Sequence, residues 1–361
     1  MFSEVGDALD MSNLRVWRDS GTKYLGLHSI SVDVKGESDA LKYIVWTKFD
    51  DCLSIVHPWN VRLAGDPNGE EGPTMSLERR YVDILTMGRS GIDIFPLQVG
   101  AHLEDVEAFG KFLGGSPTNV AVAAARLGHR SGVITGVGDD PFGRFVTREL
   151  ERLGVSSDHV VTVRDFHTPV TFAELFPPDS FPLYFYREPS APDLELGEDQ
   201  VDWNAVERAG IFWFTVTGLS RDSSFGLHLR ALDHRDRSNG VTILDLDYRS
   251  NLWSGMAQAR SRVAAVLSRV DVAVGNRQEC EMAVGVSDPE GAADALLERG
   301  VKLAIVKQGP KGTLAKTADE RVWVDAWDVD VVNGLGAGDA FGGALIHGLV
   351  EGWDLERTIR Y

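Results

Sequence analysis

A glycine-rich turn near the C-terminus has the residue types best suited to phosphate chemistry. Residues 334–339 (GLGAGD) follow a strand-like run at 329–332 and precede a run of small and apolar residues, 340–350, that predicts a helix. Glycines allow the backbone to turn tightly and to approach a ligand closely. The free N–H groups and the dipole of a helix N-terminus attract anions. The turn is therefore a candidate phosphate site, although no Lys-Ser/Thr follows its glycines as in a Walker P-loop.

Asp339 is the acidic residue of this turn, and two roles are open to it. It could interact with the dipole at the helix start, which is a common arrangement. It could instead accept the proton of a hydroxyl group that attacks a phosphate bound by the same turn. The spacing of the residues does not separate these two roles.

Strands and helices that alternate along the chain would position this turn. Strands are predicted at residues 81–87, 132–135, 211–214, 241–244, 272–274 and 303–306, and helices at 119–127, 142–153, 256–267 and 290–299. Such alternation is typical of a parallel sheet that helices cover on both faces. The strand runs are apolar throughout, as expected of strands that are buried on both sides.

Two segments interrupt this alternation. Residues 92–113 and 169–190 are predicted to be additional β structure, and the second contains six aromatic side chains. Its prolines suit edge strands. The segments could form a surface hairpin or a β lid that closes over a ligand. The number of aromatic side chains favours the lid, which is also the expected surface for a homodimer.

Composition excludes several classes of protein. The 361 residues are 43% hydrophobic and 25% charged, as in a soluble globular protein. A net charge of −18 argues against nucleic acid and anionic membranes as main partners. With two cysteines, Cys52 and Cys280, a disulfide framework or a zinc site gains almost no support. No apolar run approaches the ~18 residues of a membrane span, and no signal peptide is recognisable, so we expect a cytoplasmic protein.

The beginning of the chain differs from the rest. Residues 1–79 show no sustained helical or alternating pattern, and residues 64–74 have the composition of a linker. This extension is either a small added domain or sequence upstream of a natural start at Met75, the interpretation we favour. A single larger domain is predicted for residues 80–361.

Four segments resemble signatures of the ribokinase-like (PfkB) carbohydrate kinases. GLGAGDAFGGAL at 334–345 resembles the C-terminal signature of that family, and GGSPTN at 114–119 resembles the N-terminal signature. GVGDDPFG at 136–143 and NRQE at 276–279 resemble the motifs between them. The four occur in the family order within residues 81–361. The resemblance implies a three-layer α/β/α domain with a mainly parallel sheet and a β lid, and a kinase that uses ATP and Mg²⁺.

The resemblance assigns roles at the glycine-rich turn. Asp339 would be the general base that takes the proton of the substrate hydroxyl group. The turn itself, Gly336, Ala337 and Gly338, would stabilise the charge of the transferred phosphoryl group through its backbone amides.

The same resemblance implies ATP and metal contacts elsewhere. Residues 307–312 (KQGPKG) resemble the loop near the nucleotide phosphates, where Gly309 and Gly312 would join Gly336 and Gly338 in binding ATP. Asn276 and Glu279 would help to place Mg²⁺, through water, because this ion keeps much of its hydration.

The sugar would bind at the other signature. The family has an aspartate beyond the first strand that binds sugar hydroxyl groups, which corresponds to Asp93. Gly114, Gly115 and Asn119 would line the same pocket.

Residues 109–116, 244–249 and 332–339 resemble one branch of the family, which phosphorylates a sugar acid of inositol catabolism. A carboxylate substrate needs a cation, and arginine can bind a carboxylate in a bidentate manner. The candidates are Arg89, Arg187 and Arg249. We predict that at least one points into the pocket; if all three face solvent, the sugar-acid assignment loses its physical support.

Other functions remain open. The chain could be a kinase for 2-keto-3-deoxygluconate, fructose or a nucleoside, or a catalytically silent ligand-binding protein on this scaffold. Asn333 and Gly334 replace an Asp-Thr pair that many members carry, which puts activation by monovalent cations in doubt. Residues 357–361 begin a helix and then stop, so we expect a kinase without the usual C-terminal helices and with weakened activity.

Overall fold

The computed structural model describes residues 15–16, 30–31, 83–235 and 240–361. The chain divides into two units, Met1–Gly72 and Pro73–Tyr361. In the first unit, the described strands β1 (Arg15–Val16) and β2 (Ile30–Ser31) pair in antiparallel fashion. The predicted linker, the boundary near residue 80 and Cys52 lie outside the described residues, so the domain boundary stays a prediction.

A ten-stranded sheet forms the centre of the second unit. Its strands are β3 (Ile84–Met87), β6 (Ser131–Val137), β7 (Val155–Ser156), β8 (Val160–Thr162), β11 (Ile211–Thr215), β12 (Val241–Asp245), β13 (Val272–Asn276), β14 (Leu303–Lys307), β15 (Thr313–Lys316) and β16 (Arg321–Val324). The order is β16-β15-β14-β13-β12-β11-β3-β6-β7, with β8 also paired to β6. Only the β14–β15 and β15–β16 pairs are antiparallel, so the mainly parallel sheet is confirmed.

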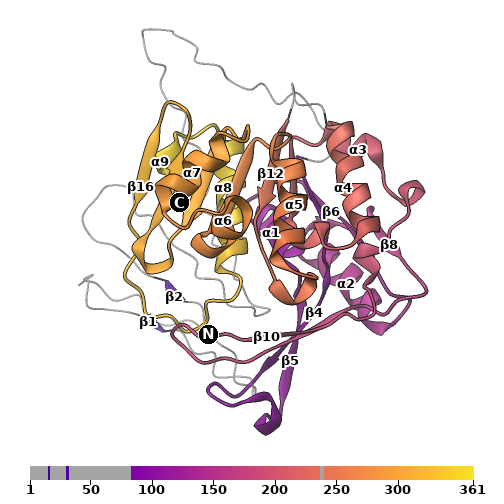
Figure 1. Cartoon of the computed structure of the whole chain (residues 1–361). Helices are drawn as coiled ribbons and strands as arrows, with labels where there is room; N and C mark the ends of the chain where they lie inside the picture. Colours follow the sequence, from indigo (N-terminus) through magenta and orange to yellow (C-terminus); the bar gives the residue numbers. More distant parts are fainter. Residues whose placement is uncertain (1–14, 17–29, 32–82, 236–239) are drawn as a thin grey trace. The chain divides into compact units, whose positions relative to one another are not determined.

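Helices cover both faces of this sheet. They are α1 (Ser116–Arg126), α2 (Pro141–Arg152), α3 (Trp203–Arg208), α4 (Asp222–His234), α5 (Met256–Leu267), α6 (Arg277–Val284), α7 (Pro289–Leu297), α8 (Ala337–Val350) and α9 (Leu355–Arg360). Figure 1 shows α3 to α7 in front of the sheet, with α1 and α8 behind it. No helix within the described ranges is long and apolar enough to cross a membrane.

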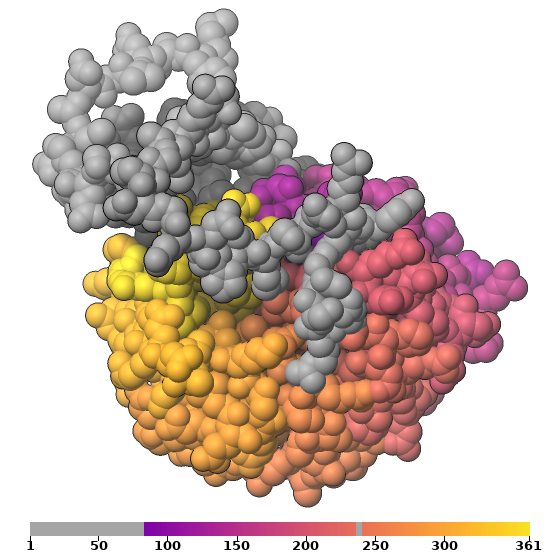
Figure 2. Space-filling view, turned by 90° about the horizontal axis from the view of Figure 1, so that it is seen from above, coloured from indigo at the N-terminus to yellow at the C-terminus, as the bar shows by residue number. Residues whose placement is uncertain are grey.

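The two helical layers bury opposite faces of the same strands. In β11, Phe212 and Phe214 belong to the core under α3 to α7, whereas Ile211 and Trp213 belong to the core under α1 and α8. Successive side chains of a strand point to opposite faces, so a continuous apolar run fills both cores. In Figure 2 the sequence colours pass from magenta to yellow across one face, which follows the order of the strands. The predicted three-layer α/β/α fold is confirmed.

The two interrupting segments form a separate four-stranded sheet. It contains β4 (Gly91–Pro96), β5 (Phe109–Gly114), β9 (Val170–Ala173) and β10 (Leu183–Tyr186), in the order β10-β9-β4-β5. Figure 1 shows β4, β5 and β10 extending beyond the carboxyl edge of the main sheet. Phe95, Ala173 and Leu175 form the small apolar cluster of this lid sheet.

One predicted element is wrong. Residues 329–332 were expected to form a strand, but no strand lies between β16 and α8. Val329 is 52% exposed, and Val331 and Val332 are each 40% exposed. Valine favours strands only where it packs against neighbouring strands, and this connection has none. The helix that follows begins at Ala337 rather than at residue 340.

Candidate active site

The carboxyl ends of adjacent parallel strands bring most of the candidate residues together. Strands β14, β13, β12, β11 and β3 are neighbours in the sheet. At or just after their carboxyl ends lie Lys307, Asn276, Asp245, Asp247, Arg249 and Arg89. Parallel strands share this edge, which is where ligands bind in open α/β sheets.

Asp339 and Asn119 meet at this edge. Asp339 lies in the first turn of α8, and α1 packs along α8. The side-chain amide of Asn119 donates a hydrogen bond from Nδ2 to Asp339 Oδ2 over 2.7 Å. Gly336 precedes the helix with φ +82°, a left-handed conformation that glycine adopts without strain. The predicted general base and a predicted sugar-pocket residue are thus in direct contact.

Lys307 brings a positive charge to the glycine-rich turn. Its Nζ lies 3.3 Å from the position that a Cβ atom on Gly338 would occupy. Burial would lower the pKa of Lys307, but the carboxylates around it raise that pKa overall. Those carboxylates belong to Asp245, Glu279, Asp339 and Asp247.

The acidic side chains around Lys307 are themselves perturbed. Burial raises the pKa of Asp245 and of Glu279, while Lys307 acts in the opposite direction on both. Repulsion from Asp247 adds to both increases. Several carboxylates are therefore held close together at one end of the sheet.

Asn276 and Glu279 form a capping box at the start of α6. Glu279 Oε2 accepts a hydrogen bond from the backbone N–H of Asn276 over 2.7 Å, and Asn276 Oδ1 accepts one from the N–H of Glu279 over 2.9 Å. The pair thus has a structural role that its N-x-x-E spacing alone explains. One Glu279 oxygen is committed to the backbone.

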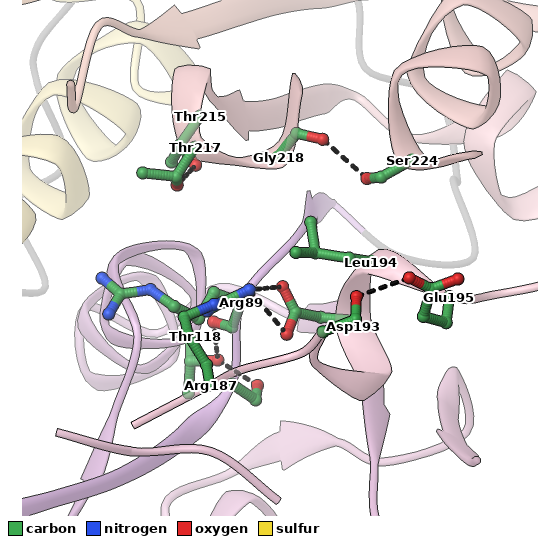
Figure 3. Close-up of polar contacts among 12 residues, drawn as sticks. Arg89, Thr118, Arg187, Asp193, Leu194, Glu195, Thr215, Thr217, Gly218 and Ser224 are labelled. Atoms are coloured by element: carbon green, nitrogen blue, oxygen red, sulfur yellow. Dashed lines mark hydrogen bonds and ion pairs between the residues drawn. The ribbon is translucent and has the colours of Figure 1, made fainter. Parts of the chain in front are cut away.

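Two of the three candidate arginines are buried. Arg89 is 9% exposed and Arg187 is 7% exposed. Arg187 pairs with Asp193 over 2.9 Å (Figure 3), and Arg249 pairs with Asp247 over 2.7 Å. The outcome that would have removed support for a sugar acid, with all three arginines facing solvent, does not occur.

Each arginine also has a buried N–H group without a partner in the described part of the chain: Arg89 Nε, Arg187 Nη1 and Arg249 Nε. Arg89 lies over the ring of Phe185 from the lid sheet, 5.0 Å from its centroid. Burial lowers the pKa of Arg89. Arg187 and Arg249 lower it further, so the three cations lie within electrostatic range of one another.

Asp93 and the two glycines of the N-terminal signature fit together. A Cβ atom on Gly114 would collide with the Asp93 carboxylate, and one on Gly115 would collide with the Arg89 carbonyl group. Gly115 also has φ +108°. The two glycines allow Asp93 and Arg89 to lie against the backbone. The Asp93 carboxylate in turn opposes the lowering of the Arg89 pKa.

The glycines after β14 differ from each other. A Cβ atom on Gly312 would collide with the Val324 carbonyl group, so packing explains that glycine. A Cβ atom on Gly309 or on Gly336 would meet no atom of a described residue within 4 Å. The described part of the chain therefore leaves space for a ligand beside these two glycines.

The lid sheet touches the glycine-rich turn. Leu335 packs against the lid cluster of Phe95, Ala173 and Leu175. The ring of Phe181, between β9 and β10, lies 3.1 Å from the Cβ position of Gly334. The ring of Phe181 and the apolar cluster of the predicted lid therefore contact the turn that is a candidate phosphate site.

Sequence analysis did not single out Lys307, Asp245 or Asp247 as site residues. A signal was available, because each stands at or just beyond the carboxyl end of a predicted buried strand. Their mutual contacts depend on the strand order, which the local pattern does not contain.

Comparison with known proteins agrees with this geometry. Residues 83–361 match the model of the pfkB family of carbohydrate kinases. A 5-dehydro-2-deoxygluconokinase of Photobacterium profundum is 33% identical over 289 residues, which cover 78% of this chain and 87% of that protein. A second protein of that name, from Clostridium perfringens, is 31% identical over 290 residues, covering 79% and 86%.

Solved structures give the same result. A PfkB protein from Polaromonas sp. superposes with a TM-score of 0.69 at 25% identity, covering 77% of this chain and 92% of that one. A protein from E. coli described as ribokinase II, solved in complex with ATP and Mg²⁺, has a TM-score of 0.70 at 26% identity, covering 77% and 89%. The chain belongs to the pfkB family of carbohydrate kinases, enzymes that transfer a phosphoryl group to a sugar hydroxyl group.

Proposed function

We propose that this kinase transfers the γ-phosphoryl group of ATP to the 6-hydroxyl group of 5-dehydro-2-deoxy-D-gluconate, a step of myo-inositol catabolism. Two relatives with this name, at 33% and 31% identity, support the proposal. The observation that carries it is the group of three arginines, two of them buried, beside Asp93. A carboxylate can accept from these N–H groups in charge-assisted hydrogen bonds, which are about twice as strong as those that the hydroxyl groups of a neutral sugar can accept.

Asp339 is the proposed general base. The 6-hydroxyl oxygen attacks the γ-phosphorus atom, and ADP leaves. The proton of the 6-hydroxyl group passes to the Asp339 carboxylate. The hydrogen bond from Asn119 fixes the orientation of that carboxylate. The amide groups of Gly336, Ala337 and Gly338, with the Lys307 ammonium group, would stabilise the charge of the phosphoryl group in transit.

Asp93, Gly114 and Gly115 are the proposed contacts of the sugar hydroxyl groups. The backbone around Gly309 and Gly336 would approach the ATP phosphates, because the described residues leave space beside both glycines. Gly312 and Gly338 would shape the two loops.

The acidic residues also fit a divalent cation. Asp247 Oδ2 is buried without a hydrogen-bond partner in the described ranges, next to the perturbed Asp245 and Glu279. Mg²⁺ would neutralise the charge of the ATP phosphates, and Asn276 and Glu279 would hold it through water. A direct contact between Glu279 and Mg²⁺ is less favoured, because Glu279 Oε2 already accepts a hydrogen bond from a backbone N–H group.

The lid sheet is a proposed contact surface between two copies of the kinase domain, residues 80–361. Phe109, Tyr184 and Tyr186 are 39%, 44% and 66% exposed on it. Exposed aromatic side chains are enriched at protein interfaces. Light scattering of the full chain, with Tyr186→Ser as the variant, tests this part of the proposal.

The decisive experiment measures phosphorylation of 5-dehydro-2-deoxygluconate, 2-keto-3-deoxygluconate, fructose and ribose by the full chain and by Asp339→Asn. We expect the first substrate to have the highest kcat/KM, with ³¹P NMR identifying a 6-phosphate. Loss of the general base should lower kcat about 10²–10⁴-fold. A preference for a neutral sugar would refute the substrate, and ATP binding without transfer to any sugar would indicate a silent ligand-binding protein.

A further inference from the structure

Three metal-ligating side chains meet far from the candidate active site. They are His129 in the connection from α1 to β6, His347 near the end of α8, and Glu351 just after α8. Their ligand atoms all lie within 4.8 Å of one another. Glu351 is about 18 Å along the helix axis from Asp339, since an α-helix rises 1.5 Å per residue. The group is therefore separate from the phosphoryl-transfer machinery.

The fold holds these side chains in place without a metal. His347 and Glu351 are four residues apart, so they share one face of α8. His129 is brought beside them because α1 packs along α8. The rings of Trp353 and Tyr361 contact the imidazole of His347, with centroids 4.9 and 5.4 Å away. The ligands are thus oriented in advance by two helix ends.

The geometry resembles that of a metal centre. His129 Nε2 and His347 Nδ1 are joined by a hydrogen bond over 2.8 Å, so the two nitrogens already face each other. In a tetrahedral zinc site with Zn–N bonds of 2.0–2.1 Å, two ligating nitrogens are about 3.3 Å apart. Zn²⁺ would take the place of this hydrogen bond. The two nitrogens would move apart by about 0.5 Å, and the hydrogen between them would move to the other nitrogen of its ring, so that each imidazole offers a lone pair.

The three side chains supply suitable donor atoms. Imidazole nitrogen is the commonest protein ligand of metals. Glu351 is exposed and adds a carboxylate.

We propose that His129, His347 and Glu351 form a binding site for Zn²⁺, with water as the fourth ligand. Two imidazoles and a carboxylate are a known zinc ligand set, and Mg²⁺ prefers oxygen ligands and would not compete. The cysteine count could not reveal this site, because its ligands are histidines 218 residues apart. A bound ion would link the end of α8 to the start of β6 and so stabilise the helix pair.

The test is a titration of the full chain with Zn²⁺ by isothermal calorimetry, in excess Mg²⁺ so that the carboxylates of the active site are occupied. We expect one equivalent to bind with micromolar or tighter affinity, and the unfolding temperature to rise. His129→Ala and Glu351→Gln should each weaken this binding at least tenfold. His167→Ala is the matched control, because the side chain of His167 is fully exposed and remote from the group in sequence.

Substitution with Co²⁺ gives a second measurement. A tetrahedral site has intense visible absorption, which His129→Ala should abolish. Absence of a bound equivalent, or affinity that His129→Ala and Glu351→Gln leave unchanged, would overturn the proposal. Circular dichroism of the zinc-free variants separates loss of the site from loss of the fold.

Discussion

Asn119 and Asp339 are joined by one hydrogen bond across 220 positions of sequence. The bond orients the Asp339 carboxylate. Loss of this hydrogen bond should therefore affect the transition state more than the binding of ATP. We predict that Asn119→Ala lowers kcat while the KM for ATP stays unchanged. Steady-state kinetics measures both constants, and Asn204→Ala, an exposed substitution on α3, is the control. An increase in KM alone would show that Asn119 only binds substrate.

The Lys307 ammonium group lies 3.3 Å from the Cβ position of Gly338 and acts to lower the pKa of both Asp245 and Glu279. We predict that Lys307→Met lowers kcat about 10²–10³-fold, the usual effect of removing one preorganised electrostatic contact. Lys307→Arg should restore part of the loss. The control is Lys302→Met, just before the same strand, where the lysine pairs with Asp271 at the opposite edge of the sheet. Equal losses for Lys302→Met and Lys307→Met would indicate a general effect on β14.

Arg89 should distinguish a sugar acid from a neutral sugar. We predict that Arg89→Gln lowers kcat/KM for the carboxylate substrate about 10–100-fold, which corresponds to one lost charge-assisted hydrogen bond. The kcat/KM for the primary amide of the same sugar acid should change little, because the amide has no charge to pair with Arg89. Arg144→Gln, on the exposed side of α2, provides the control. Similar losses for acid and amide would mean that Arg89 supports the fold rather than the carboxylate.

The elements were predictable wherever burial and sequence pattern agreed. Helix α5 spans Met256–Leu267, as its pattern predicts, and β11 to β14 lie where the apolar runs are. The strand expected at residues 329–332 shows the limit of such patterns. Its valines carry the same strand preference as those of β13, but they remain exposed because no neighbouring strand buries them.

The candidate site was predictable residue by residue but not as an arrangement. Asp339, Asn119 and Asp93 were each identified through resemblance to a family. That Asn119 holds Asp339, and that Lys307 stands among four carboxylates, follows from strand order and from the packing of α1 on α8. Both are contacts between distant segments, which local patterns do not encode.

Helix α4 carries a histidine that should make the fold sensitive to acid. His228 is buried, donates from Nδ1 to the Ser224 carbonyl oxygen over 2.8 Å, and packs against Phe214. Burial lowers its pKa from 6.5 to about 4. Between pH 6.5 and about pH 4, His228 is protonated in the unfolded chain and neutral in the folded chain. The free energy of unfolding therefore falls as the pH is lowered through this range. The full loss is about 3 kcal/mol.

We predict that His228→Asn, which keeps a donor for Ser224, removes this part of the pH dependence. The free energy of unfolding, measured in urea between pH 7 and pH 4.5, should fall less steeply for the variant. The quantity to compare is the slope of the free energy of unfolding against pH, because the smaller side chain will also lower that free energy at every pH. Parallel slopes for variant and wild type would mean that His228 is protonated in the folded state.

At the scale of the whole molecule, the parallel sheet explains how the site is assembled. One edge of the sheet holds the residues that follow strands β14, β13, β12, β11 and β3. The first turns of α1 and α8 lie at the same edge. The lid sheet reaches this edge where Phe181 lies beside Gly334 and where the lid cluster packs against Leu335. Every described side chain of the candidate site thus belongs to Pro73–Tyr361.

This distribution leads to a prediction about the two units of the chain. Among the described residues, all members of both cores of the α/β/α domain come after position 83, and the family match covers residues 83–361. We therefore expect a shortened chain that begins at Pro73 to fold and to keep its kcat, its KM for both substrates and its unfolding temperature. Kinetics and calorimetry of the two chains side by side measure these quantities. A drop in the unfolding temperature with kinetics retained would assign residues 1–72 a stabilising role, whereas a loss of kcat would mean that they contribute to the active site.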